Sequence, residues 1–360
     1  MGFFARGEGA DGAQRSEDLA RIEGGGIPSG AEQRLRALGR GEGMFTSGLS
    51  VNEFALLGRM GPQPLAQVMG ASVVRTGWQY LPALEPGRVV ISNAAARGYS
   101  RGPTGYQASN LYGEPSMAQV RSYKWRWSVV CELQVLSDAW NLARRRALDR
   151  LTEEALQVGA DAVVGVHLHR SDHDLGRGTI EYVVSGTAIR LPGSDGSSWP
   201  RLTDVSVQDY WRLRSGGHEP AGFLAVTSVW FAAPSRVTRL QRRRQPTRNQ
   251  ELEELSRAVN AARDTVRARL LGQVSDAHGV GAVGVEFSHQ VYRDKLAVAS
   301  AFSETRRGWH AGRLGIPYKV TGRTDVERRG WVITMHAAGT AITSAKRGPA
   351  SAPIRTQVHM

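Results

Sequence analysis

The feature of this sequence that most restricts its fold is an internal duplication. Residues 49–74, LSVNEFALLGRMGPQPLAQVMGASVV, resemble residues 205–230, VSVQDYWRLRSGGHEPAGFLAVTSVW, at a constant offset of 156 positions. Each copy begins with a short segment, turns at Gly and Pro, and enters a β-branched run, which is typical of a turn or short helix leading into a strand. The repetition predicts that one structural unit is built twice.

A second block, residues 146–166 against 265–285, repeats at an offset of 119. At the same offset, from just before this block onward, apolar residues recur at steps of three and four: Trp140, Ala143, Ala147, Leu151, Ala155 and Val158 in the first copy, and Val259, Ala262, Val266, Leu270, Val274 and Ala277 in the second. The spacing predicts two long helices that bury the same face. The expected helix ends are Ser137 and Gly159 in the first copy, and Asn249 and Gly279 in the second.

A third block closes each copy at an offset of 153, with VVSGTAIRL at 183–191 against HAAGTAITS at 336–344. The order of elements predicts an α+β fold of two tandem β-α-β-β units, each a small antiparallel sheet covered by one long helix. The expected division is an N-terminal tail with a short helix at 1–43, a first unit at 44–192, a second unit at 193–346 and a C-terminal tail at 347–360. Two insertions, a glycine-rich one near 91–119 and a second near 296–329, show no hydrophobic periodicity and are therefore expected to be loops.

The stretch GADAVVGVHL at 159–168, which follows the first long helix, and the GTAI strand after it resemble the YbjQ-like family of heavy-metal-binding domains. The resemblance covers 137–191 well, and 251–289 with 334–344 less closely. It implies a small β-α-β-β unit, similar to the dodecin subunit, that forms ring-like homo-oligomers. It supports the fold and the assembly more than any activity.

The stretch HLHRSDHD at 167–174 is the strongest candidate for a metal site. Side chains alternate along a strand, so one face of the expected strand should lie under the helix: Ala162, Val164, Val166 and Leu168. His167 and His169 would then share the opposite face, with Cα atoms about 6.6–7 Å apart. His173 in the following turn could complete a ligand set suited to zinc, nickel or copper.

The alternative interpretation of this stretch is the polar end of a strand running into a turn, where His and Asp are common. The second copy supports that alternative, because it carries Glu286 and Ser288 at the positions of His167 and His169.

The chain is basic, with a formal net charge of +13, and part of the excess lies in RVTRLQRRRQPTRNQ at 236–250. Arg242, Arg243 and Arg244 at its centre are candidates for binding phosphates, a nucleic acid or another anionic partner. The alternative is a solvated linker between a strand and a helix. No aromatic residue interleaves the arginines, which argues against single-stranded nucleic acid.

Several functional classes lack their sequence signals. One cysteine, Cys131, permits neither an intrachain disulfide nor a thiolate cluster. GVGAVG at 279–284 matches the dinucleotide pattern but follows a helix and opens a strand, the reverse of the order that binding needs. No GxSxG, HExxH or P-loop occurs. A binding protein is therefore favoured over an enzyme, and no membrane span or secretion signal is expected, which makes cytoplasmic location the expectation.

The expected sheets predict self-association. One face of each lies under its helix, and the last strand of the first copy places apolar residues on both faces, whereas a solvated face would be mostly polar. Exposed edge strands also need partners. We therefore expect a ring-like homo-oligomer, with a pentamer favoured, that acts as a scaffold or binding protein with a possible divalent metal. The alternatives are a monomer whose insertions cover the sheet, an anion-binding module, and an enzyme with a site between subunits.

Overall fold

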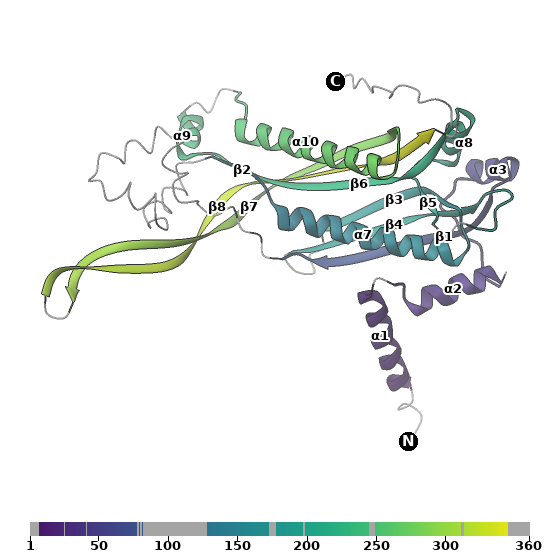
Figure 1. Cartoon of the computed structure of the whole chain (residues 1–360), viewed down its shortest axis with the longest axis horizontal. Helices are drawn as coiled ribbons and strands as arrows, with labels where there is room; N and C mark the ends of the chain where they lie inside the picture. Colours follow the sequence, from purple (N-terminus) through teal and green to yellow (C-terminus); the bar gives the residue numbers. More distant parts are fainter. Residues whose placement is uncertain are drawn as a thin grey trace.

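The computed structural model describes residues 7–24, 26–40, 42–77, 79, 81, 128–172, 178–196, 199–244, 249–310 and 313–344. The insertion near 91–119 and the tail at 347–360 lie outside these residues. The elements follow in this order: α1 Gly7–Glu23, α2 Ser29–Gly39, α3 Val51–Met60, β1 Gln63–Arg75, β2 Val129–Glu132, α7 Gln134–Gln157, β3 Ala162–Asp172, β4 Thr179–Arg190, β5 Arg201–Leu202, α8 Val207–Ser215, β6 His218–Ala233, α9 Arg236–Arg244, α10 Glu253–Asp276, β7 Gly281–His310 and β8 Arg313–Ser344 (Figure 1).

The predicted α+β class is confirmed, with two four-stranded sheets. The first sheet has the order β1-β4-β3-β5 and the second the order β2-β6-β8-β7. Both are antiparallel apart from the short parallel pair of β3 and β5. The described part of the N-terminal 43 residues forms two helices, α1 and α2, where the sequence predicted one short helix.

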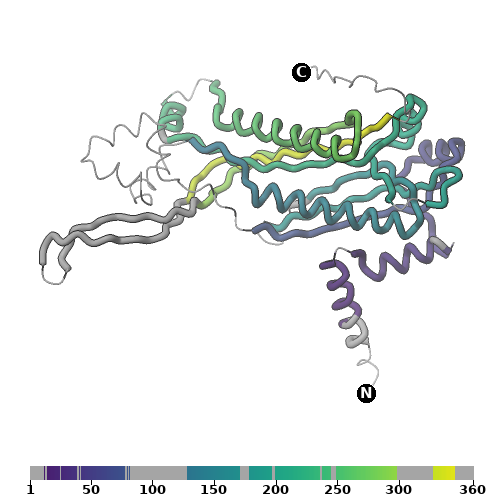
Figure 2. Tube along the Cα trace, viewed as in Figure 1, coloured from purple at the N-terminus to yellow at the C-terminus, as the bar shows by residue number. Residues whose placement is uncertain are grey.

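The helices and sheets form successive layers: α10, the second sheet, α7 and the first sheet. α10 covers one face of the second sheet, while the other face of that sheet meets α7 and the first sheet in a shared core (Figures 1 and 2). α7 in turn packs on β1 and β4 of the first sheet. A smaller core at one end of the first sheet contains Leu57 of α3 and Tyr210 of α8. The second sheet is thus covered on both faces, and the first sheet is covered by α7 on one.

A β-bulge interrupts the same strand of each sheet. The register of β3 shifts beside Gly165 and that of β7 beside Gly284, and both glycines have left-handed φ values, 59° and 64°. Glycine adopts such angles without steric cost. The two positions are 119 residues apart, as are the helical stripes in the sequence.

The bulge reverses the side-chain alternation along β3. Ala162 and Val164 pack in the small core with α3 and α8, whereas Val163 and Val166 pack in the core with α7. The prediction that Ala162 and Val164 lie under the long helix is therefore wrong, because an extra residue at Gly165 shifts the pleat by one position.

The GTAI strands lie opposite these bulges. A Cβ atom added at Gly186 would lie 2.6 Å from a methyl carbon of Val163, and one added at Gly339 would lie 3.0 Å from a methyl carbon of Val285. A larger residue at either position would crowd the bulged strand, which approaches the last strand closely there.

Neither long helix begins at its predicted cap: α7 starts before Ser137 and α10 starts after Asn249. α7 follows Leu133 and α10 follows Leu252, which have nearly equal backbone angles of −93°, 81° and −91°, 77°. Ser137 is a buried residue inside the first turns of α7, and Asn249 precedes α10 by several residues, so neither caps its helix. The left-handed residue after α7 is Gly159, as predicted, but after α10 it is His278, one residue before Gly279.

The insertion near 296–329 is not a loop, contrary to the prediction. It extends β7 and β8 as one antiparallel hairpin, with pairing that continues from Leu296↔Arg328 to His310↔Arg313. A two-stranded ribbon has no sheet face to bury, so its sequence need not show the alternation by which strands are recognised.

Candidate assembly site at the junction of the two sheets

The beginning of α7 satisfies the exposed edge of β6. β2 pairs with β6 only from Val129↔Ala233 to Glu132↔Trp230. Beyond it, the Leu133 N–H donates to the Val229 carbonyl at 2.7 Å, and the Val229 N–H donates to Oγ of Ser137 at 2.9 Å. A strand edge is thus completed by a helix N-terminus that continues the line of β2.

Asn141, one turn further along α7, binds the same edge with its side-chain amide. Its Nδ2 donates to the Thr227 carbonyl at 2.9 Å, and its Oδ1 accepts from the Thr227 N–H at 3.1 Å. This pair of bonds imitates a β-ladder and fixes the position of α7 along β6.

Glu132 is the charged centre of the junction. Its carboxylate accepts hydrogen bonds from Ser137 at 3.0 Å and Ser228 at 2.9 Å. Arg269 of α10 donates both terminal nitrogens to it, at 2.8 and 3.0 Å. The Arg269 side chain is partly exposed, but its two parallel bonds to one carboxylate make this a strong type of polar contact.

A buried polar cluster lies behind this edge. Oγ1 of Thr227 lies 2.8 Å from Nδ1 of His336 and 3.2 Å from the hydroxyl of Tyr182, which joins the two sheets directly. The Trp140 ring meets the rings of Tyr182 and His336 edge to face. Burial lowers the pKa of His336 to about 3, so its imidazole is neutral near pH 7.

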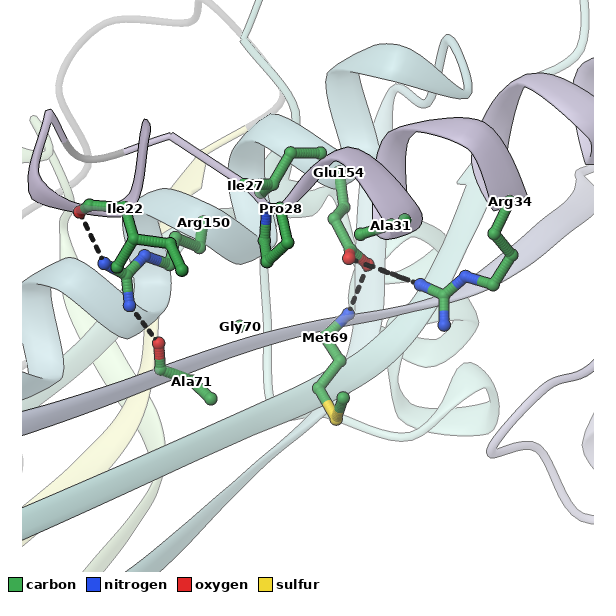
Figure 3. Close-up of a pocket in the computed structure, with 11 residues that line it drawn as sticks. Ile22, Ile27, Pro28, Ala31, Arg34, Met69, Gly70, Ala71, Arg150 and Glu154 are labelled. Carbon is green, nitrogen blue, oxygen red and sulfur yellow. Dashed lines mark hydrogen bonds and ion pairs between the residues drawn. The ribbon is translucent and has the colours of Figure 1, made fainter. Parts of the chain in front are cut away.

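The edge of β1 is the counterpart of the β6 edge, and Figure 3 shows what meets it. The Met69 N–H donates to Glu154 of α7 at 2.8 Å, and the Ala225 N–H of β6 donates to Gln273 of α10 at 3.2 Å. Met69 and Ala225 are 156 positions apart, and Glu154 and Gln273 are 119 positions apart, so the two bonds occupy equivalent places in the two copies. The long helix therefore supports its own first strand in the same way in both halves.

The β1 and β6 edges differ in the partner of the arginine that the long helix contributes. Arg150, the counterpart of Arg269, donates to the carbonyls of Ala71 and Ile22 rather than to a carboxylate (Figure 3). Ile22 belongs to α1, and a cavity of about 360 Å³ lies between the α1–α2 turn, β1 and α7.

The outward faces of the two sheets also differ. Val229 and Ala225 of β6 are 1% and 4% exposed, because the first half of the chain covers them. At the same positions of β1, Val73 and Met69 are 55% and 46% exposed. The first sheet thus presents to solvent the face that the second sheet buries.

The predicted metal ligands are only partly placed by the structure. His167 and His169 are exposed on β3, and His173 lies outside the described residues. Across the described part of the chain, no three His, Cys, Asp or Glu side chains gather closely enough to hold a metal ion. Asp204, whose pKa is raised chiefly by burial, interacts electrostatically with His167, and so does Glu53.

The predicted arginine cluster is divided by the structure. Arg242 forms an ion pair with the buried Glu254 at 2.8 Å, while Arg243 and Arg244 are exposed on α9. Two arginines of the three therefore remain open to a partner.

The residues of the junction were not predicted as a site from the sequence. A signal was present, because Glu132, Ser137 and Asn141 each have an identical residue 119 positions later in the second copy. Apolar periodicity could not reveal it, because Glu132 precedes the helix and Ser137 and Asn141 are polar.

Comparison with known proteins confirms the resemblance seen in the sequence. Residues 121–192 match the YbjQ family model, described as "Putative heavy-metal-binding". The chain is 28% identical over 260 residues to an encapsulin nanocompartment protein of Mycobacterium tuberculosis, which covers 71% of this chain and 82% of that protein.

Shorter relatives match the same family region. A UPF0145 protein of Halobacterium salinarum is 43% identical and one of Clostridium novyi 38% identical, each over 60 residues that make up 17% of this chain and 56% of the relative. No solved structure matches the chain. Among the described helices, none combines the length and apolar character that crossing a membrane requires.

Proposed function

Since residues 121–192 belong to the YbjQ type, we propose that this chain is a cytoplasmic, homo-oligomeric scaffold or binding protein built from two tandem β-α-β-β units. Its copies stack head to tail, as its two halves do within one chain. The observation that carries this proposal is the contrast between the outward faces of the two sheets, with Val229 buried and Val73 exposed.

The junction inside the chain joins two different surfaces: the helix side of the first unit and the outward face of the second. A contact between different surfaces is heterologous, and its repetition gives a closed ring or an open filament. After one such contact, the chain still presents the outward face of the first sheet at one end and α10 at the other. We favour a closed ring of five chains. The relative named as a nanocompartment protein supports a role in an assembly.

Light scattering on the purified full chain tests this proposal. We expect a mass that is a multiple of the 39.1 kDa chain, with five chains as the favoured count. The substitution Val73→Asp should shift the mass toward one chain, because a charge would have to be buried in the interface. Val237→Asp on α9 is the matched control, since Val237 is also exposed but lies on another surface. A mass near 39 kDa for the parent protein at micromolar concentration would reject self-assembly.

Divalent-metal binding is the second candidate, favoured by the description of the matched family. The described residues fit such a site incompletely, since His167 and His169 provide two ligands where zinc sites use three or four. Titration calorimetry with zinc and with nickel tests it. The change His167→Ala with His169→Ala should weaken binding at least tenfold, whereas His289→Ala on β7 should not. Equal affinity of the parent and the double variant would remove this candidate.

A further inference from the structure

We propose that a second copy of this chain docks on the free edge of β1 through the beginning of its α10, in the register with which β2 and α7 dock on β6. The inference rests on the proposed self-assembly and specifies its interface. It follows from the fact that the polar groups of the internal junction occur twice, while among the described residues only one set binds a strand edge.

The docking segment is duplicated residue for residue. Four residues of the first unit contact the β6 edge: Glu132, Leu133, Ser137 and Asn141. The same residue types stand 119 positions later, at the start of α10: Glu251, Leu252, Ser256 and Asn260. Leu133 and Leu252 also share their backbone angles, so the two segments enter their helices with the same geometry.

The second set is accessible where the first is buried. Ser137 is 1% exposed in the junction, whereas Ser256 is partly exposed and Glu251 and Asn260 are exposed. Within the part of the chain that the structure describes, the Asn260 amide makes no hydrogen bond, while the Asn141 amide makes three. α10 therefore carries a docking segment without the strand edge that it matches.

The receiving edge is duplicated as well. Ser228 and Val229 of β6 correspond to Ser72 and Val73 of β1, and Arg269 of α10 corresponds to Arg150 of α7. Among the described strands, β1 pairs only with β4 and leaves its other edge without a strand. Thr46 and Glu154 already bind this edge at Gln67 and Met69, so the stretch around Val73 is the part that can accept an added segment through its backbone groups.

These correspondences fix the contacts between copies. The Leu252 N–H of one copy donates to the Val73 carbonyl of the next, and the Val73 N–H donates to Ser256. The Asn260 amide pairs with the backbone of Ala71. Residues 249–251 extend the first sheet along 74–76, as β2 extends the second sheet along β6.

The charged centre of this interface is Glu251 of one copy and Arg150 of the next. Inside a single chain, Arg150 donates to the Ile22 carbonyl at 2.9 Å and to Ala71 (Figure 3). Docking exchanges the Ile22 carbonyl for the Glu251 carboxylate, which is the stronger acceptor because it is charged. The end of α1 must therefore move away from Arg150 when a neighbour arrives.

A charge exchange in the full-length protein tests this interface. Glu251 is exposed in the single chain, so Glu251→Arg should leave the fold intact and reduce the mass measured by light scattering to that of one chain. Arg150→Glu should have the same effect, and the double variant Glu251→Arg with Arg150→Glu should recover the assembled mass. Asn260→Ala should weaken self-association at least tenfold, and Arg257→Ala, an exposed residue of the same helix, is its control.

The outcomes separate the two proposals. A parent protein that is a single chain contradicts self-assembly itself. A parent that assembles, together with a Glu251→Arg variant that assembles equally well, contradicts this interface and leaves self-assembly standing.

Discussion

The two long helices end in the same hydrogen-bond pattern but with different residues at the left-handed position. After α7, the Ala160 N–H donates to the Ala155 carbonyl at 3.0 Å, and after α10 the Gly279 N–H donates to the Val274 carbonyl at 2.8 Å. The left-handed residue is Gly159 with φ of 69° in the first case and His278 with φ of 51° in the second. The substitution His278→Gly should therefore stabilise the protein.

The magnitude follows from two opposing contributions. A residue with a Cβ atom in the left-handed region costs about 1–2 kcal/mol relative to glycine. Glycine also gains conformational entropy in the unfolded chain, which offsets about 0.4–1 kcal/mol of that. The expected net gain for His278→Gly is about 0.5–1 kcal/mol in the free energy of unfolding.

Urea unfolding at pH 7 measures this gain as a higher midpoint with an unchanged slope. His278→Ala is the matched control, because it removes the imidazole but keeps a Cβ atom in the left-handed region. Gly159→Ala should destabilise, since its φ is 69° and its Cβ atom would lie 2.5 Å from the Arg190 guanidinium. The reasoning is refuted if His278→Gly does not stabilise, or if His278→Ala stabilises as much.

Three further predictions concern packing, pH and charge. Gly70→Ala should cost about 3 kcal/mol or more or prevent folding, seen in urea unfolding, because its Cβ would overlap the Ala147 carbonyl and lie 2.7 Å from the Leu151 nitrogen. His336 should lower the free energy of unfolding by about 2 kcal/mol between pH 7 and pH 5. Its pKa is lowered to about 3 in the fold, where it stays neutral, while in the unfolded chain it takes up a proton below about pH 6.5. The variant His336→Gln should lack this pH-dependent loss of stability. If α9 binds polyphosphate, Arg243→Ser with Arg244→Ser should flatten the salt dependence of the affinity, and an unchanged slope would exclude these two arginines.

The sequence could predict the features that repeat with regular spacing. The apolar stripes placed the buried faces of α7 and α10 correctly, with Ala147 and Val266 fully buried in their cores. The α+β class followed from the order of the three repeated blocks. The offset of 119 also relates the bulges at Gly165 and Gly284, and this link can be read in the sequence once the structure reveals it.

The features that were missed depend on contacts between distant segments. β2 is readable as a strand, but nothing local indicates that it leaves its own unit to pair with β6. The prediction of which β3 side chains face the helix assumed strict alternation, and it failed at Gly165 because the extra residue of the bulge moves every later side chain to the opposite face. Serine is common at helix caps, which is why the sequence favours a cap at Ser137, whereas its hydroxyl accepts from the Val229 backbone.

A density map of the assembled particle tests the central claim most directly, because it would show what covers the outward face of the first sheet. We predict a head-to-tail arrangement in which α10 of one copy begins at the β1 edge of the next, with Glu251 beside Arg150 and Val73 buried. A symmetric contact between two β1 edges, or a particle in which Val73 remains exposed to solvent, would contradict it.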